Sequence, residues 1–325
     1  MKRFFAILLA LILILGAVFT IRFISAPQSC EKTAFALNTV IKISVWGKDA
    51  SVAADAALKE IRRIDGLMSA HSTSSEIYAL NTAGVGKEVK VSKEVFDLIK
   101  LARDIWQKSG GAFDITLKPL SDLWNIQAEN PKVPKAYEIE SALKKTGFEY
   151  VELNESNCTV TFKKDGMSAD LGAIAKGYAA DRAAQILKEH GIKSALIDLG
   201  GNIYALGRNK NGQRWKIGLQ TPWTERGEYF ETVEAENKAV VTSGAYERYF
   251  EKDGKIYHHI IDPETGCPSQ SGISSVTVIY ENSAVADALS TAVFVSGKQC
   301  AETMKSIFGD IEIIIVTNDG KTIKY

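Results

Sequence analysis

The sequence has no excess of charge of either sign and few cysteines. Lys and Arg together number 39, as do Asp and Glu, and four cysteines occur among 325 residues. Because no net positive field draws the chain to a polyanion, we expect no nucleic-acid partner. No two cysteines form a CxxC pair or a zinc-ligand spacing, which disfavours a redox or zinc centre.

The common nucleotide-binding glycine motifs are also absent. Neither GxGxxG nor GxxxxGK[ST] occurs, so the Rossmann fingerprint and the P-loop do not apply. The expected helices and strands follow one another without a regular βαβ repeat, which favours an α+β fold over a doubly wound sheet. Hydrophobic residues make up 46% of the chain, enough for a large core.

The N-terminus departs from this balanced composition. Residues 4–21 carry no charge and follow Lys2 and Arg3. A run of this length suits a membrane helix of roughly 17–25 residues better than the roughly 7–15 apolar residues of a cleavable signal. We therefore expect residues 1–29 to be a signal anchor with its tether. The basic end would stay in the cytoplasm, and residues 30–325 would form one domain on the extracytoplasmic face of the cell membrane.

Two other fates of the N-terminus stay open. A cleaved signal peptide is possible, although Pro27 directly follows Ala26 and disfavours processing there. Cys30 could instead carry a lipid, although residues 27–29 fit a lipoprotein processing site poorly.

Hydrophobic periodicity predicts the main elements of the domain. Alternation predicts one strand over residues 36–47, and the helical period predicts amphipathic helices over 50–69 and 92–108, the latter with Ser92 as its N-cap. Further expected elements are a helix over 138–145, a hairpin over 150–162, a helix from about 175 to 190, a strand over 195–199, a helix over 282–295 and a strand over 312–316.

The strongest candidates for chemistry lie between residues 257 and 291. Asp287 and Thr291 are four residues apart, so a helix places both on one face, with Ser290 beside them. Carboxylate and hydroxyl oxygens are ligands that Mg²⁺ accepts when it holds phosphate groups. His259 suits proton transfer near neutral pH, although it could equally be a core histidine bonded to backbone. Asp262 could simply shape the turn that follows it.

Glycines recur where helices begin or strands end, at Gly110–Gly111, Gly172, Gly177, Gly200–Gly201 and Gly244. Glycine lets a backbone approach a phosphate closely, and a helix start offers unpaired N–H groups to an anion. Lys176 stands among these glycines and could pair with such an anion.

Taken in order, these motifs resemble the ApbE family, the FAD:protein FMN transferases. The resemblance runs from about residue 35 to the C-terminus, on SGGAFDIT at 109–116, DLGAIAKGYA at 170–179, GGN at 200–202, TSG at 242–244, HIIDP with TG at 259–266, and ADALST at 286–291. It implies an ApbE-like α+β fold of mixed, mainly antiparallel sheets with packed helices.

The resemblance also implies an activity. Family members split FAD at its pyrophosphate with Mg²⁺, transfer FMN through a phosphoester bond to a threonine or serine hydroxyl of another flavoprotein, and release AMP. Their acceptors include membrane subunits of sodium-pumping NADH:quinone oxidoreductases and Rnf-type complexes. Two alternatives remain from the residues alone: an FAD pyrophosphatase, in which water replaces the acceptor, and a non-catalytic membrane-tethered FAD-binding protein.

Carried over residue by residue, the resemblance implies roles for individual side chains. His259 corresponds to the catalytic histidine, and Asp287, Thr291 and the Ala173 backbone correspond to the Mg²⁺ ligands, with Ser290 adjacent. The FAD contacts correspond to Leu37, His71, Ala112, Phe113, Asp114, Asp170, Lys176, Ser243, Ile260 and Ile261. Leu37 stands where the family often has methionine, and His71 stands where it often has tyrosine. These two departures affect details of FAD contact more than the reaction.

Overall fold

The computed structural model describes residues 29–325. The expected membrane segment at residues 4–21 and the alternative cleavage position at Ala26 lie outside the described residues. Within residues 29–325, no helix is both long enough and apolar enough to span a membrane.

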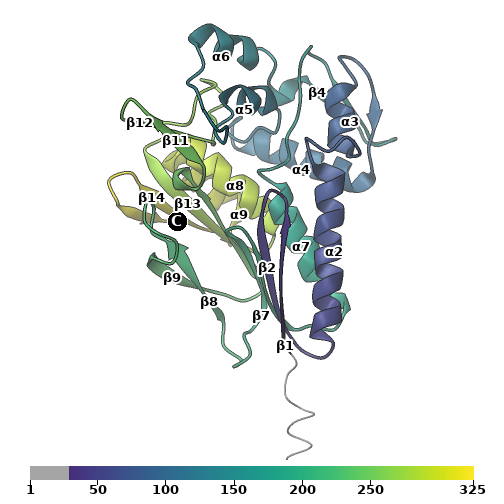
Figure 1. Cartoon of the computed structure of the whole chain (residues 1–325), viewed down its shortest axis with the longest axis vertical. Coiled ribbons are helices and arrows are strands. Elements are labelled where there is room, and N and C mark those ends of the chain that lie inside the picture. The colour runs from purple at the N-terminus through teal and green to yellow at the C-terminus, as the bar shows by residue number, and fades with distance from the viewer. Residues whose placement is uncertain (1–28) are drawn as a thin grey trace, which may run out of the picture.

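An antiparallel sheet of eight strands forms the centre of the fold (Figure 1). Each neighbouring pair of strands is antiparallel, which confirms the α+β class without βαβ units. In spatial order the strands are β1 (Ser29–Ala36), β2 (Thr39–Trp46), β6 (Ser194–Leu199), β7 (Asn202–Gly207), β10 (Lys238–Gly244), β13 (Ile273–Tyr280), β14 (Glu312–Thr317) and β15 (Thr322–Lys324).

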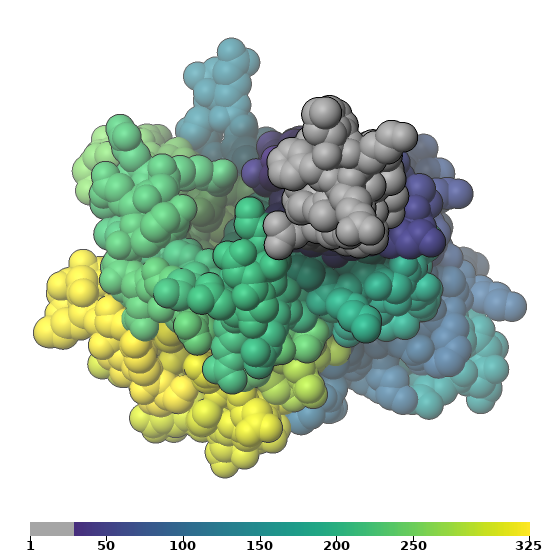
Figure 2. Space-filling view, turned by 90° about the horizontal axis from the view of Figure 1, so that it is seen from below, coloured from purple at the N-terminus to yellow at the C-terminus, as the bar shows by residue number. Residues whose placement is uncertain are grey.

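Antiparallel pairing brings several chain reversals to one end of this sheet. The pairs Ala36–Thr39, Asp198–Ile203 and Gly244–Ser275 all lie at that end. We call it the site end; it comprises the β1–β2 turn, the β6–β7 turn, the end of β10 and the start of β13. The opposite end, where β1 begins, is seen from below in Figure 2.

Helices cover one face of the sheet, and α7 packs between α2 and α8 (Figure 1). Small side chains permit the close packing, since Ala53 and Ala57 of α2 and Ala179 and Ala183 of α7 are fully buried. The helices are α2 (Ala50–Met68), α3 (Glu76–Thr82), α4 (Lys93–Lys108), α5 (Lys118–Trp124), α6 (Ala136–Leu143), α7 (Ala175–Glu189), α8 (Ser283–Ser296) and α9 (Lys298–Phe308).

The hairpin of β8 (Trp215–Gln220) and β9 (Tyr229–Ala235) covers part of the other face of the sheet. Side chains along β10 alternate accordingly: Ala239 and Val241 face the helices, whereas Val240 packs with the hairpin. The central sheet therefore has an apolar core on both faces.

A ribbon of two strands, β11 (Tyr249–Lys252) and β12 (Lys255–His258), lies beside α5 and α6. The Trp124 ring of α5 stacks on Tyr257, and its Nε1–H donates to the Gly266 carbonyl at 2.8 Å. These contacts anchor the loop that contains His259. A smaller sheet of β3 (Val89–Lys90), β5 (Thr159–Phe162) and β4 (Val151–Asn154) completes the fold.

Most of the expected elements are present, including α2, α4, α6, α7, α8, β6, β14 and the β4–β5 hairpin. Ser92 caps α4 as expected by accepting a hydrogen bond from the Val95 N–H. The single strand expected over residues 36–47 is wrong, because the chain reverses at Leu37 and Asn38 and forms the β1–β2 hairpin. Helix α9 and strand β15 were not expected from the sequence.

Candidate active site

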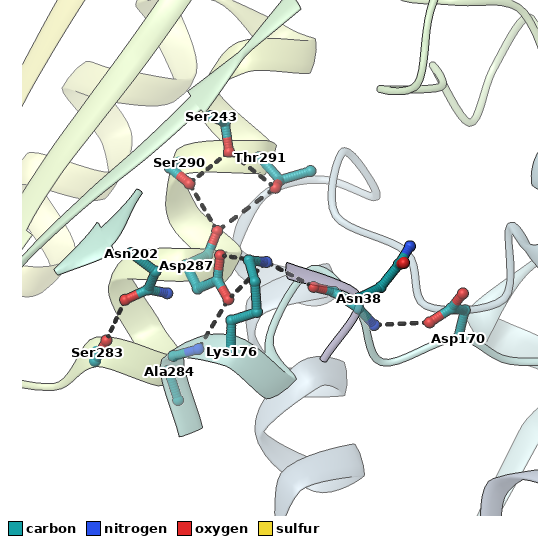
Figure 3. Close-up of polar contacts among 12 residues, drawn as sticks. Asn38, Asp170, Lys176, Asn202, Ser243, Ser283, Ala284, Asp287, Ser290 and Thr291 are labelled. Atoms are coloured by element: carbon teal, nitrogen blue, oxygen red, sulfur yellow. Dashed lines mark hydrogen bonds and ion pairs between the residues drawn. The ribbon is translucent and has the colours of Figure 1, made fainter. Parts of the chain in front are cut away.

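Asp287 of α8 faces the first turn of α7 (Figure 3). Its Oδ2 accepts a hydrogen bond from the Gly177 N–H at 2.9 Å, and Lys176 Nζ lies 3.4 Å from each carboxylate oxygen. The side chain is almost inaccessible, and this burial raises the pKa of Asp287, against the opposing effects of Lys176 and the Gly177 N–H. A buried carboxylate with one nearby ammonium group would gain from a further cation.

Hydroxyl groups lie next to Asp287. Ser290 Oγ donates to the Asp287 carbonyl at 2.8 Å and lies 2.7 Å from Ser243 Oγ of β10. Thr291 Oγ1 is less firmly held, at 3.4 Å from Ser243 Oγ and 3.5 Å from the same carbonyl. Because Ser290 is fully buried and already bonded, Thr291 is the more available ligand of the two.

The segment just before α7 leaves a carbonyl oxygen without a hydrogen bond in the part of the chain that the structure describes. The Gly177 N–H donates to Asp287, and no hydrogen bond to the Ala173 carbonyl occurs within residues 29–325. Asp287, Thr291 and Ala173 thus offer carboxylate, hydroxyl and carbonyl oxygens. This set fits Mg²⁺, which commonly uses one or two carboxylates and completes its shell with water and phosphate oxygens. The described part of the chain has no cluster of three or more His, Cys, Asp or Glu side chains suited to a metal.

The close approach of α7 to α8 depends on Gly177. A Cβ atom at this position would lie 2.2 Å from the Ser283 carbonyl oxygen. The α8 N-terminus is also held by Asp181 of α7, whose carboxylate accepts hydrogen bonds from the N–H groups of Ser283 and Ala284. Burial raises the pKa of Asp181 to about 6.

The loop before α7 links Asp170, through Gly172, to Lys176. Lys176 Nζ donates to the Gly172 carbonyl at 2.8 Å, and the Gly172 N–H donates to Asp170 Oδ1 at 2.8 Å (Figure 3). The Asp170 N–H donates to the Ile115 carbonyl, so the segment 112–116 adjoins this loop.

In the segment 112–116, the side chains are buried or hydrogen-bonded within the protein. Phe113 is in the main core, and Ala112 is buried. Asp114 accepts hydrogen bonds from the N–H and Oγ1 of Thr116, at 2.7 Å each, and from the Phe148 N–H. Burial raises the pKa of Asp114 to about 6. The FAD contacts predicted here remain predictions. Because its ring is buried in the core, Phe113 could contact FAD only through its backbone.

The β1–β2 turn is strained at the site end. Leu37 and Asn38 have φ angles of 51° and 56°, and the left-handed region is costly for a leucine. Two contacts hold the turn: Arg248 Nη2 donates to the Asn38 carbonyl at 3.2 Å, and Thr39 packs on Gly200, where a Cβ would lie 1.9 Å from Thr39 Oγ1. Strain of this kind persists where the surrounding structure maintains it, often at functional sites.

The two adjacent histidines have different environments. His258 is buried: its Nδ1 accepts a hydrogen bond from the Ile260 N–H, and its Nε2 lies 3.0 Å from the Ser269 carbonyl, to which it must donate. Both ring nitrogens are therefore occupied. Burial also lowers the pKa of His258, so this ring is neutral and structural.

His259 is exposed and has one ring nitrogen free. Its N–H donates to the Arg248 carbonyl at 3.1 Å, and its Nδ1 lies 3.3 Å from the same oxygen. A carbonyl can only accept, so Nδ1 carries the proton and Nε2 has an unshared pair in the neutral ring. Solvent reaches the residue, but nearby protein atoms partly desolvate the ring; this desolvation, followed by repulsion from Arg248, His258 and Lys176, lowers the pKa of His259.

The remaining predicted residues lie around this loop. Ile260 and Ile261 are buried, Ile261 in the apolar cluster with Trp124. Asp262 shapes the turn, since its carboxylate accepts hydrogen bonds from the Glu264 N–H and Thr265 Oγ1. His71 is exposed after α2, and in the described part of the chain no contact links it to Asp287.

Two residues of the site, Arg248 and Asn202, were not expected from the sequence. Arg248 was missed because it acts on His259 through a backbone carbonyl, which every residue type has. Asn202 belongs to the GGN motif, which could have identified it. Its Oδ1 accepts a hydrogen bond from Ser283 Oγ, while its buried Nδ2 points toward Asp287 without reaching hydrogen-bonding geometry (Figure 3).

Comparison with known proteins places this geometry in a family. Residues 37–315 match the model of the ApbE family. An FAD:protein FMN transferase of Treponema pallidum is 38% identical over 284 residues, covering 82% of this chain and 78% of that protein. One of Klebsiella pneumoniae is 36% identical over 289 residues, covering 88% and 89%.

Solved structures agree with the sequence comparison. The crystal structure of the ApbE protein of Thermotoga maritima has a TM-score of 0.84 at 37% identity, covering 91% of this chain and 97% of that chain. The flavin transferase ApbE of Vibrio cholerae has a TM-score of 0.82 at 26% identity, covering 92% and 97%. The chain therefore belongs to the ApbE family.

Proposed function

We propose that this chain is an FAD:protein FMN transferase that uses Mg²⁺ and modifies a threonine or serine hydroxyl of an acceptor flavoprotein. The transferase activity is supported by the relatives that bear this name and align over most of the chain. One observation of the structure carries the mechanism: the ring of His259 is held so that Nδ1 carries the proton and Nε2 can accept another.

The metal would be held by Asp287 Oδ atoms, Thr291 Oγ1 and the Ala173 carbonyl. When bound there, Mg²⁺ supplies positive charge for the pyrophosphate oxygens of FAD. Lys176 is paired with Asp287 at 3.4 Å. With the carboxylate neutralised, its ammonium group would be released to bind a phosphate oxygen.

His259 would act as the general base. Its Nε2 accepts the proton of the acceptor hydroxyl while that oxygen bonds to the FMN phosphorus. The bond from this phosphorus to the bridging oxygen breaks, and AMP leaves. The negative charge of bound FAD would raise the lowered pKa of His259 toward neutrality, where a general base is most effective.

We also propose that residues 1–29 anchor the chain and that the domain faces the extracytoplasmic side. The apolar run at residues 4–21 supports this. β1 begins at the end of the sheet remote from the site end, and its eight residues span roughly 25 Å at about 3.3 Å each. An anchored domain would thus present its site away from the bilayer, toward acceptors such as Rnf-type or sodium-pumping NADH:quinone oxidoreductase subunits.

The test incubates the full-length chain in detergent with FAD, MgCl₂ and an Rnf-type acceptor domain that carries the modified threonine. We expect the acceptor to gain the mass of one FMN, and EDTA to prevent the gain. Free FMN and AMP without labelled acceptor would identify a pyrophosphatase instead. Bound, intact FAD would identify a binding protein.

Two variants test the roles proposed for His259 and Asp287. His259→Gly is expected to abolish transfer while FAD still binds, and lost FAD binding would refute its role as base. Asp287→Ala is expected to weaken Mg²⁺-dependent transfer, and full activity at low Mg²⁺ would refute its role as ligand.

A further inference from the structure

A small hollow of about 210 Å³ opens at the site end of the sheet, between the β8–β9 loop and the segment after β10. Three aromatic side chains, Trp223, Tyr246 and Tyr249, line it together with the ion pair of Arg226 and Glu247. None of these residues is among those assigned above to Mg²⁺ binding, FAD binding or proton transfer.

Trp223 has a costly backbone conformation in this hollow. Its φ is 66°, a genuine outlier for so bulky a residue. The indole is fixed by a hydrogen bond from Nε1 to Ser274 Oγ and by edge-on contacts with Tyr249 at 5.2 Å and Tyr246 at 6.2 Å. Yet 43% of the residue remains exposed. The fold thus maintains a strained, rigid indole at the surface instead of burying it in the core.

The hollow adjoins the proposed general base. Arg248, whose carbonyl orients His259, stands between two lining residues, Glu247 and Tyr249. Tyr249 also pairs directly with His258 across the β11–β12 ribbon. A molecule bound in the hollow would therefore lie beside the strand that leads to His259.

The size of the hollow excludes a flavin or nucleotide. Small-molecule sites usually measure about 300–1,000 Å³, and this volume suits a single side chain. Exposed Trp, Tyr and Arg residues are typical of the anchors at protein interfaces, where a polar rim surrounds an apolar centre. The Arg226–Glu247 pair, with 83% of the Arg226 side chain exposed, supplies such a rim.

We infer that this hollow binds an apolar side chain of the acceptor protein, close in its sequence to the hydroxyl that receives FMN. The inference rests on the proposed function, because transfer to a protein requires a protein surface beside His259. Of the surface next to that residue, this hollow offers a preformed recess with three aromatic rings and a charged rim. The hollow would select the acceptor protein, while the residues that bind FAD and Mg²⁺ and His259 serve the transfer itself.

The test compares Trp223→Gly and Tyr249→Ala with the wild type, using the same Rnf-type acceptor domain. Glycine relieves the positive φ, which offsets part of the packing lost with the indole, and Tyr249→Ala leaves the Trp223 backbone unchanged; unfolding curves check that both variants fold. We expect KM for the acceptor domain to rise about tenfold or more, with kcat at saturating acceptor and the Kd for FAD unchanged. Ile307→Ala on α9, 46% exposed in the wild type, is the control and should leave all three unchanged.

Direct binding of the acceptor domain, measured without FAD, separates this inference from the proposed function. A wild-type chain that binds the domain but transfers no FMN would overturn the transferase proposal alone. Equal acceptor binding by the wild type and both variants would overturn the docking proposal alone, as would a weakened Kd for FAD in the variants.

Discussion

The carbonyl of Arg248 accepts two hydrogen bonds from His259, one from the backbone N–H at 3.1 Å and one from ring Nδ1 at 3.3 Å. The pair fixes both the position and the tautomer of the ring. The guanidinium of Arg248 also donates to the Asn38 carbonyl, so one residue joins the proposed base to the strained β1–β2 turn.

The first prediction concerns the pH dependence of the reaction. Because its surroundings lower the pKa of His259, the base stays unprotonated below the usual imidazole range. We therefore expect His259 to contribute no acid limb near pH 6.5 to kcat/KM for FAD, which reports the free enzyme. Burial raises the pKa values of Asp114 and Asp181 to about 6, so initial rates between pH 5 and 8 are compared with those of Asp114→Asn and Asp181→Asn, with folding checked at each pH. An acid limb near pH 6.5 that persists in both variants would contradict the prediction.

The second prediction isolates the charge of Arg248. Arg248→Gln removes the guanidinium charge and leaves the backbone carbonyl, so His259 keeps its tautomer while repulsion on its protonated form falls. The pKa of His259 should rise, and the acid limb of kcat/KM should move to higher pH. KM for FAD should also rise, because the turn loses its bond at Asn38. Arg248→Lys retains the charge and serves as the control. Identical profiles for both variants would refute the electrostatic role.

The sequence predicted the parts of the site that depend on spacing and residue type. Asp287 and Thr291 share a helix face because they are four residues apart, and the predicted helices provided that face. The β1–β2 hairpin could not be predicted in the same way, since Leu–Asn is not a residue pair typical of such turns. Nor could the role of Arg248, because its carbonyl carries no residue-specific signal. Phe113 shows a further limit: its motif is recognisable, but only the structure shows its ring in the core.

The third prediction concerns Leu37, a predicted FAD contact in the left-handed conformation. Leu37→Gly removes a backbone cost of about 1–2 kcal/mol for that conformation and loses some packing of the partly buried side chain. We expect the free energy of unfolding to change by less than about 1 kcal/mol, while KM for FAD rises. Chemical denaturation and steady-state kinetics measure the two effects. An unchanged KM for FAD would show that the Leu37 side chain does not contact FAD.

The last prediction tests whether helix packing sets the metal site. In Gly177→Ala the new Cβ meets the Ser283 backbone 2.2 Å away, and backbone cannot rotate aside as a side chain can. Helices α7 and α8 must separate, at a cost of roughly 1–3 kcal/mol or more. The separation also moves Ala173 and the Gly177 N–H away from Asp287, so half-maximal activity should require more Mg²⁺.

Gly66→Ala in α2 is the matched control, because no atom lies within 4 Å of its Cβ position. This substitution should stabilise the helix by roughly 0.5–1 kcal/mol and leave the Mg²⁺ requirement unchanged. Unfolding curves and Mg²⁺ titrations of the two variants decide the question. If Gly177→Ala lost stability with an unchanged Mg²⁺ requirement, the α7–α8 contact would support the fold without setting the ligand geometry.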